Sequence, residues 1–118
     1  MVSSPVSPLR FEVHLIDLDP TQGSEIRKTR PCVVVSPDEM NRHLRTIIIA
    51  PMTSTLRGYP SRVNFTFQRK HGQVALDQIR TVDKSRLVRK LGSVPAETAQ
   101  LIAGTLQEVF AYDTPSPA

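Results

Sequence analysis

Five segments of the chain have the apolar pattern of β-strands. Two of them, residues 32–35 and 46–52, are short runs rich in Val and Ile, which is typical of strands buried on both faces, so we place them at the centre of a sheet. The first segment alternates between apolar and polar residues, with Val13 and Leu15 on one face. The predicted strands are residues 11–18, 32–35, 46–52, 62–67 and 73–82.

Three further segments predict helices. The motif Ser36-Pro37-Asp38-Glu39 matches a capping box and predicts a short helix over residues 37 to about 43. Asp83 can cap a second short helix over residues 84–91, which Gly92 ends. The clearest helix begins near Pro95, and an apolar stripe along it should cover one face or edge of the sheet. The members of the stripe are Leu101, Ile102, Leu106, Val109 and Phe110.

The order of these elements favours a mainly β fold with added helices. About five strands with no βαβ alternation indicate a curled, mostly antiparallel sheet, which a small barrel closes economically; an open α+β sheet remains the alternative. The length of 118 residues and the apolar content of 39% fit one domain. We place this domain at residues 9–112. Residues 1–8 and 113–118 are rich in Ser and Pro, and we assign them to flexible tails.

Charge and cysteine content narrow the function. The net charge of +4 and the pI of 9.7 favour a polyanionic partner such as nucleic acid. Cys32 is the single cysteine, which excludes an internal disulfide framework and favours a reducing cytoplasm. No signal-peptide core and no long apolar run is present, so we expect a soluble, unexported protein. The spacing of His14, His43 and His71 does not suggest metal ligation and favours surface or interface roles.

The chain has no glycine-rich phosphate loop, metal-ligand spacing or nucleophile elbow. The remaining candidates for a functional site are three polar segments next to the predicted strands. The first, residues 19–31, places Arg27, Lys28 and Arg30 directly before a buried strand. In the second, Thr53 and Ser54 leave the end of an apolar strand. The third is residues 77–80.

Each of these segments also has a purely structural interpretation. Arg30 could form a surface salt bridge with Glu25 or Asp19, which would have little energetic weight. Thr53 could end its strand with a local hydrogen bond to the backbone. Asp77 could cap a turn or pair with Arg80, so a structural and a functional role both remain open for it.

A series of short motifs runs through these segments in a fixed order. They are Asp17-x-Asp19-Pro20, Gly23-Ser24-Glu25, Arg30-Pro31, Ser36-Pro37 with Asn41, Pro51-x-Thr53-Ser54, Gly58-Tyr59-Pro60 and Asp77-Gln78-x-Arg80. In these motifs, from about residue 10 to residue 110, the chain resembles the MazF/PemK family of toxin–antitoxin ribonucleases. The resemblance implies an SH3-like (CcdB/MazF-like) antiparallel barrel with inserted helices and a C-terminal helix, a homodimer, and a cognate antitoxin as partner.

The resemblance also implies a reaction and roles for individual residues. A ribose 2′-hydroxyl of single-stranded mRNA would attack the adjacent phosphate at a specific sequence, with no metal and no cofactor. Arg30 would neutralise the scissile phosphate, Thr53 would donate a hydrogen bond to it, and Asp77 would be a catalytic or base-contacting carboxylate. The RNA-binding residues that we assign are Ser24, Glu25, Arg27, Lys28, Ser54, Arg57 and Gln78.

Several positions depart from the family's pattern. Phe11 stands where the family usually has Gly, and Ile26 and Lys28 stand where it usually has Gln and Gly, so we expect a stiffer and more cationic first loop. One branch has a His in place of Ser24 and an Arg in place of Ala75, so its acid and base are not carried over. The alternatives are a CcdB-like toxin that binds gyrase without hydrolysis, and a catalytically decayed relative that binds only antitoxin or RNA.

Overall fold

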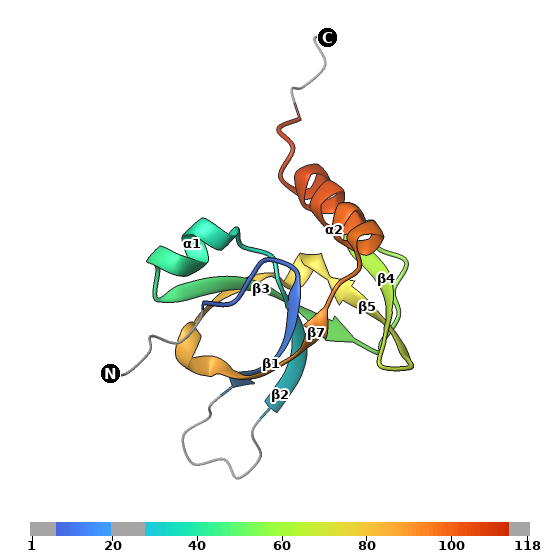
Figure 1. Cartoon of the computed structure of the whole chain (residues 1–118). Helices are drawn as coiled ribbons and strands as arrows, with labels where there is room; N and C mark the ends of the chain where they lie inside the picture. Colours follow the sequence, from blue (N-terminus) through green and yellow to red (C-terminus); the bar gives the residue numbers. More distant parts are fainter. Residues whose placement is uncertain (1–6, 20–27, 114–118) are drawn as a thin grey trace, which may run out of the picture.

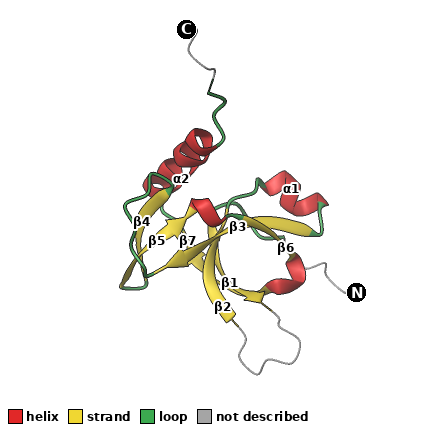
Figure 2. Cartoon of the chain, turned by 180° about the vertical axis from the view of Figure 1, so that it is seen from behind, coloured by secondary structure: helices red, strands yellow, loops and turns green. Residues whose placement is uncertain are grey.

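The computed structural model describes residues 7–19 and 28–113, and in this part of the chain seven antiparallel strands curl into a half-open barrel (Figures 1 and 2). The strands follow the order β4-β5-β3-β2-β1-β7, and β6 pairs with the first half of β3. The strands are β1 (Glu12–Asp19), β2 (Lys28–Val34), β3 (Thr46–Thr53), β4 (Arg62–Phe67), β5 (Lys70–Ala75), β6 (Arg80–Asp83) and β7 (Leu87–Ser93). The helices are α1 (Asp38–His43) and α2 (Ala96–Val109), with single 3₁₀ turns at η1 (Leu76–Gln78) and η2 (Lys84–Arg86).

The predicted central position of β2 and β3 is confirmed. Because successive side chains of a strand point to opposite faces of the sheet, the residues of β2 reach two different cores: Val33 packs with Val13 and Ile102, whereas Cys32 and Val34 pack with Ile16. All of these side chains are fully buried. Burying an aliphatic side chain of this size contributes roughly 1.5–3 kcal/mol, so the two strands form a rigid base for the residues at their ends.

The prediction of one strand over residues 73–82 is wrong, because the 3₁₀ turn η1 divides it. Both parts lie along the same edge of β3: Met52 opposes Val74, and Ile49 opposes Arg80. From Met52 to Ile49 the chain of β3 covers three residues, whereas from Val74 to Arg80 the partner covers six. The three extra residues are those of η1. The turn pushes Asp77 out of the strand pairing and towards the surface.

The helix predicted over residues 84–91 is also wrong. The Asp83 carboxylate does accept a hydrogen bond from the Ser85 amide at 2.9 Å, but only one 3₁₀ turn follows. The chain then continues as β7, in which Arg89 opposes Leu15 of β1. Pairing with β1 satisfies the backbone groups along that edge of the sheet, and this tertiary gain outweighs local helix propensity.

The predicted helix α1 is present, but the predicted capping box is not. Pro37 occupies the N-cap position, which has no side-chain hydrogen bond. The Ser36 hydroxyl instead donates to Asn41 Oδ1 and accepts from the Ile48 amide at 3.0 Å. The Asn41 amide group donates to the carbonyl oxygens of Pro8 (3.1 Å) and Ser36 (3.0 Å). Pro8 is buried, so it belongs to the packed structure and not to the tail that the sequence assigned.

Replacing Asn41 with alanine should lower the free energy of unfolding by about 2 kcal/mol, because the fully buried amide satisfies three polar groups that water cannot reach. Urea unfolding of the variant measures this loss. The matched control is Glu39→Ala on the exposed side of the same helix, which should change stability by less than about 0.5 kcal/mol. Equal stabilities of the two variants would contradict this role of Asn41.

The apolar stripe predicted on the C-terminal helix covers the sheet only in part. Ile102 is buried and Leu106 packs against the core, where α2 contacts β4 and η1. Leu101, Val109 and Phe110 are exposed. Val109 and Phe110 lie at the C-terminal end of α2, which extends away from the barrel (Figure 1), whereas Leu101 is exposed beside the buried Ile102 in the first half of the helix. Within the described residues no helix is long and apolar enough to cross a membrane.

Two residues before and within β1 have unexpected environments. Phe11 has a φ of 69°, a backbone conformation that glycine adopts more easily than phenylalanine does. Its ring packs against the core and lies under the Arg10 guanidinium at 4.9 Å. His14 is buried with its Nε2 2.9 Å from Glu12 Oε1, so the surface or interface role predicted for it is wrong.

Candidate functional site

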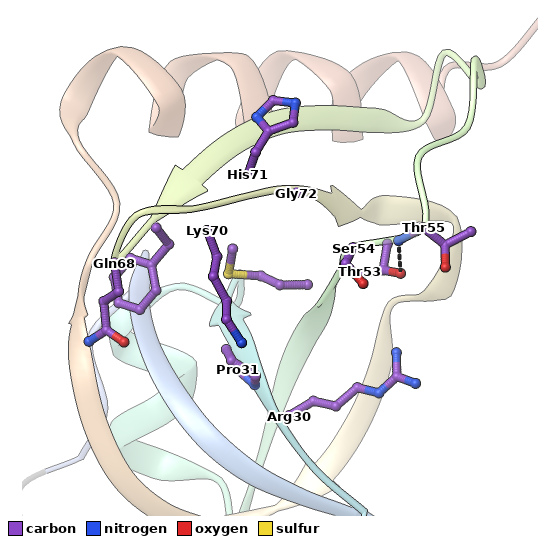
Figure 3. Close-up of a pocket in the computed structure, with 11 residues that line it drawn as sticks. Arg30, Pro31, Thr53, Ser54, Thr55, Gln68, Lys70, His71 and Gly72 are labelled. Atoms are coloured by element: carbon purple, nitrogen blue, oxygen red, sulfur yellow. Dashed lines mark hydrogen bonds between the residues drawn. The ribbon is translucent and has the colours of Figure 1, made fainter.

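Two adjoining hollows lie where β2 begins and β3 ends, and both are lined by Arg30, Thr53 and Thr55; Figure 3 shows the first of them. The first hollow measures about 410 Å³ and the second about 540 Å³. The first is completed by Pro31, Met52, Ser54, Phe67, Gln68, Lys70, His71 and Gly72. The second is completed by Arg57, Tyr59, Arg62, Asp77 and Gln78. Of the predicted site residues, the structure therefore brings together Arg30, Thr53, Ser54, Arg57, Asp77 and Gln78.

Arg30 has a fixed backbone and an exposed side chain. It opposes Ile16 in the pairing of β1 with β2, and its carbonyl oxygen accepts a hydrogen bond from Cys32 Sγ at 3.5 Å. Its guanidinium makes no hydrogen bond or ion pair with any other described residue. The predicted alternative partners, the side chains of Asp19 and Glu25, lie outside what the structure describes. A cation held in this way at the junction of two hollows is suited to binding an anion.

Thr53 ends β3 and faces the same junction. Its Oγ1 accepts a hydrogen bond from the Thr55 amide at 3.1 Å, which is the local backbone bond that the structural interpretation predicted. This bond uses an oxygen lone pair and leaves the hydroxyl hydrogen free to donate. The structural role and the predicted donation to a phosphate are therefore compatible.

Gly72 allows β5 to pass close to the end of β3. A Cβ placed on it would lie 2.7 Å from the Thr53 carbonyl oxygen, which is closer than van der Waals contact permits. The residue is buried, and it lines the first hollow. The position of Thr53 therefore depends on the absence of a side chain at residue 72.

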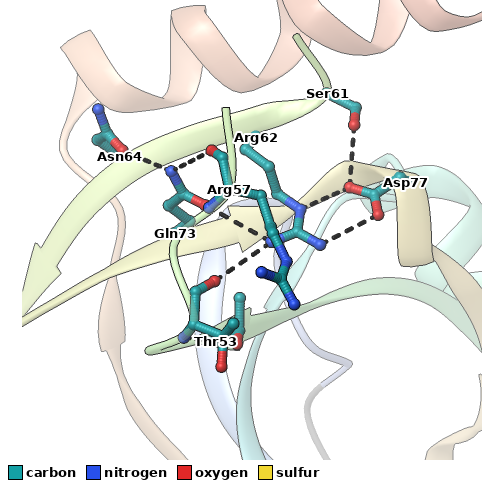
Figure 4. Close-up of polar contacts among 8 residues, drawn as sticks. Thr53, Arg57, Ser61, Arg62, Asn64, Gln73 and Asp77 are labelled. Carbon is teal, nitrogen blue, oxygen red and sulfur yellow. Dashed lines mark hydrogen bonds and ion pairs between the residues drawn. The ribbon is translucent and has the colours of Figure 1, made fainter. Parts of the chain in front are cut away.

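Asp77 pairs with Arg62 and not with Arg80 (Figure 4). Arg62 Nε donates to Asp77 Oδ1 at 2.7 Å and Nη2 donates to Oδ2 at 3.2 Å, and the Ser61 hydroxyl also donates to Oδ1 at 2.9 Å. The hydrogen bonds from Arg62, chiefly, lower the pKa of Asp77 from 3.8 to about 2. A carboxylate with so low a pKa is a weak base near neutral pH.

The pair of Asp77 with Arg62 should contribute to the free energy of unfolding, and this contribution should be lost in acid. Because folding lowers the pKa of Asp77, the pair stabilises the fold fully above the ordinary carboxyl pKa, and the stabilisation falls as the pH drops from about 4 to about 2. The Asp77 side chain is 33% exposed, so we expect at most about 1 kcal/mol. Between about pH 5 and pH 2.5, urea midpoints of the wild type should fall more steeply than those of Asp77→Asn. Parallel curves would show that the pair does not stabilise the fold.

The other predicted site residues belong to the first loop. Ser24, Glu25 and Arg27 lie outside the described residues, and Lys28 marks the start of β2. Sequence reasoning missed Arg62, Lys70 and Gly72, which also line the hollows. The pattern of β4 placed Arg62 opposite the apolar face of Val63, but nothing local to residue 62 indicated its partner.

Metal ligands and a nucleophilic thiol are not found among the described residues. There, no group of three or more His, Cys, Asp or Glu side chains is arranged to hold a metal ion. Burial raises the pKa of the Cys32 thiol to about 12, which keeps it protonated and unreactive. The two hollows present arginine and hydroxyl groups, together with Lys70 and His71 in the first and Asp77 in the second.

Comparisons with known proteins give a consistent result. Residues 9–110 match the family described as the PemK-like, MazF-like toxin of type II toxin-antitoxin system. The endoribonuclease toxin MazF of Escherichia coli strain K12 is 36% identical over 88 residues, which are 74% of this chain and 79% of the relative. An endoribonuclease solved with its cognate antitoxin from a mycobacterial species has a TM-score of 0.77 at 28% identity, covering 92% of this chain and 100% of that one. A MazE-MazF structure from Deinococcus radiodurans has a TM-score of 0.76 at 26% identity, covering 91% and 98%.

Proposed function

Because this chain belongs to the PemK-like, MazF-like family of type II toxins, we propose that it is a toxin–antitoxin endoribonuclease that cleaves single-stranded mRNA at a short sequence without a metal ion. The observation that carries the proposal is the junction of the two hollows, where Arg30, Thr53 and Thr55 meet. A relative that is 36% identical is named as an endoribonuclease, which supports the same activity here.

The reaction that fits this junction is an internal transfer at phosphorus. The ribose 2′-oxygen forms a bond to the adjacent phosphorus atom as its proton leaves, and the bond from phosphorus to the 5′-oxygen breaks. The products are a 2′,3′-cyclic phosphate and a 5′-hydroxyl, which gains a proton. Negative charge builds on the phosphate oxygens in between, and preorganised donors that meet this charge lower the barrier.

Arg30 and Thr53 supply those donors. The planar guanidinium of Arg30 can bind two phosphate oxygens at once. The free hydroxyl hydrogen of Thr53 can donate to the same phosphate. Asp77 acts through its hold on Arg62, because both of its carboxylate oxygens accept hydrogen bonds from that guanidinium.

The RNA continues from the scissile phosphate into both hollows. Ser54 lies in the first hollow, which is also lined by Met52 and Phe67, and apolar groups of this kind suit the face of a base. Arg57 and Gln78 lie in the second hollow. The first loop adds Ser24, Glu25, Arg27 and Lys28, among which Glu25 can accept hydrogen bonds from a base edge.

The protein acts as a homodimer in the cytoplasm and is inhibited by a cognate antitoxin. Both solved neighbours described above contain the antitoxin with the toxin, which supports such a partner here. An acidic, partly disordered antitoxin segment laid over the two hollows would occupy the place of the RNA.

The decisive test uses the purified protein with a long single-stranded RNA in the presence of EDTA. Discrete cuts with 5′-hydroxyl ends are expected, and their positions give the recognition sequence. Cleavage that needs added Mg²⁺ would contradict the metal-free mechanism. Intact RNA across many sequence contexts would contradict the nuclease activity and favour a toxin that acts by binding alone.

A further inference from the structure

Gln73 is a buried side chain that holds one loop residue by its backbone. It lies on β5 with 6% of its surface exposed. Its Oε1 accepts a hydrogen bond from the Arg57 amide at 3.0 Å, and its Nε2 donates to the Arg57 carbonyl oxygen at 3.0 Å (Figure 4). These two bonds fix the orientation of the amide, because one of its ends must accept and the other must donate, and Nε2 also donates to Asn64 Oδ1 at 3.0 Å. Gln73 thus binds Arg57 much as one strand binds its neighbour.

Arg62 holds the same loop at two other points. Besides its two bonds to Asp77, Nη1 donates to the Thr55 carbonyl oxygen at 3.4 Å and to Gln73 Oε1 at 3.5 Å. Its guanidinium lies 5.1 Å from the centre of the Tyr59 ring. The side chain is only 5% exposed, and four of its five N–H groups are engaged, so it is poorly placed to bind RNA itself.

Hydrogen bonds fix the backbone of Arg57, whereas its side chain is exposed. Its guanidinium lines the second hollow together with Arg30 and makes no hydrogen bond or ion pair with any other described residue. The segment that carries it, between β3 and β4, has no helix or strand of its own. Without Gln73 and Arg62, this segment would have little to keep Arg57 beside Arg30.

We propose that Gln73 and Arg62, with Asp77 behind them, form a positioning clamp that presents Arg57 to an RNA phosphate next to the scissile one. The inference rests on the proposed function and adds the residues that set the geometry of its RNA track. A loop that is ordered before RNA binds does not lose that freedom on binding, so the clamp raises affinity without touching the RNA. The clamp residues are positioning residues, and Arg57 is the group that contacts substrate.

The test is a double-mutant cycle on cleavage of a short RNA that contains the mapped cut site. Arg57→Ala should raise KM about tenfold, and Gln73→Leu, which keeps the volume but loses both backbone bonds, should raise it about three- to tenfold. In the Arg57→Ala background, Gln73→Leu should change KM by less than about twofold, because the clamp then has no cation to position. Asn64→Ala is the matched control: it removes one bond of Gln73, leaves both bonds to Arg57, and should leave KM within about twofold of the wild type.

The salt dependence of binding gives a second readout that general loosening of the core would not change. Affinity for a 2′-deoxy analogue, which cannot be cut, decreases as the salt concentration rises. In Arg57→Ala the slope of log affinity against log salt should be shallower by about 0.7. The slope should also be shallower in Gln73→Leu, although glutamine carries no charge. If Gln73→Leu does not fold, Gln73→Asn, which is too short to reach Arg57, replaces it.

The outcomes separate this inference from the proposed function. Active wild-type protein with coupled effects of the two substitutions supports the clamp. Active protein in which the effects on KM multiply independently, or in which only Arg57→Ala changes the salt slope, overturns the clamp and leaves the nuclease activity standing. Wild-type protein that cuts no RNA overturns both.

Discussion

Replacement of Arg30 by alanine is expected to lower the rate of RNA cleavage by about 10²- to 10³-fold, because it removes the cation at the junction of the two hollows. Removing one donor to a developing phosphate charge costs about 2.7–4 kcal/mol of transition-state stabilisation. The fold should be unaffected, since Arg30 is exposed and only its backbone contributes to the sheet. Single-turnover cleavage of the mapped RNA site measures the loss, with the melting temperature of each variant as the check on folding.

Two further variants identify the cause of that loss. Arg30→Lys keeps the charge but not the planar fork, and it should recover only part of the rate. Arg45→Ala removes the same charge from an exposed site after α1 and should cleave at nearly the wild-type rate. If Arg45→Ala were as inactive as Arg30→Ala, net charge and not position would explain the effect.

A methyl group at residue 72 should impair both stability and cleavage. In Gly72→Ala the new Cβ would lie 2.7 Å from the Thr53 carbonyl oxygen, so β3 or β5 must shift. Overpacking of this kind costs roughly 1–3 kcal/mol of stability. Because the shift falls on the residue that donates to the phosphate, we expect cleavage to fall by at least about tenfold even where the variant is fully folded.

The matched control for this prediction is Gly104→Ala. Gly104 lies in α2, and a Cβ placed there has no atom within 4 Å. The same chemical change should therefore raise the free energy of unfolding by about 0.5–1 kcal/mol, because alanine favours a helix more than glycine does. Urea unfolding and cleavage of the mapped RNA, measured on both variants, test the pair. Wild-type cleavage by Gly72→Ala would show that the end of β3 tolerates the displacement.

The sequence predicted those elements whose signal is local. The Val- and Ile-rich runs at residues 32–35 and 46–52 form the buried centre of the sheet, because only a strand covered on both faces needs apolar side chains in succession. The alternation over residues 62–67 gave β4 the bounds that it has. The motifs around Arg30 and Thr53 indicated the family, and the family implied the barrel.

Elements that depend on partners distant in sequence were not predictable in this way. Residues 87–93 form β7 because β1 offers an unpaired edge, although their pattern alone favoured a helix. Ser36 has the sequence position of a helix cap, but it is bound to Asn41 and Ile48 instead. Three of the five residues of the apolar stripe, Leu101, Val109 and Phe110, are exposed, because only Ile102 and Leu106 meet the core.

The sequence by itself thus determined the strand-rich core, the family and the two residues, Arg30 and Thr53, that meet at the junction of the hollows. Only the tertiary structure decided what surrounds them. The turn η1 adds three residues opposite β3 and places Asp77 beside Arg62, while the close passage of β5 requires glycine at residue 72. The physical reason is that hydrophobic periodicity records which face of an element is buried, whereas ion pairs and close backbone contacts depend on where the sheet brings distant residues together.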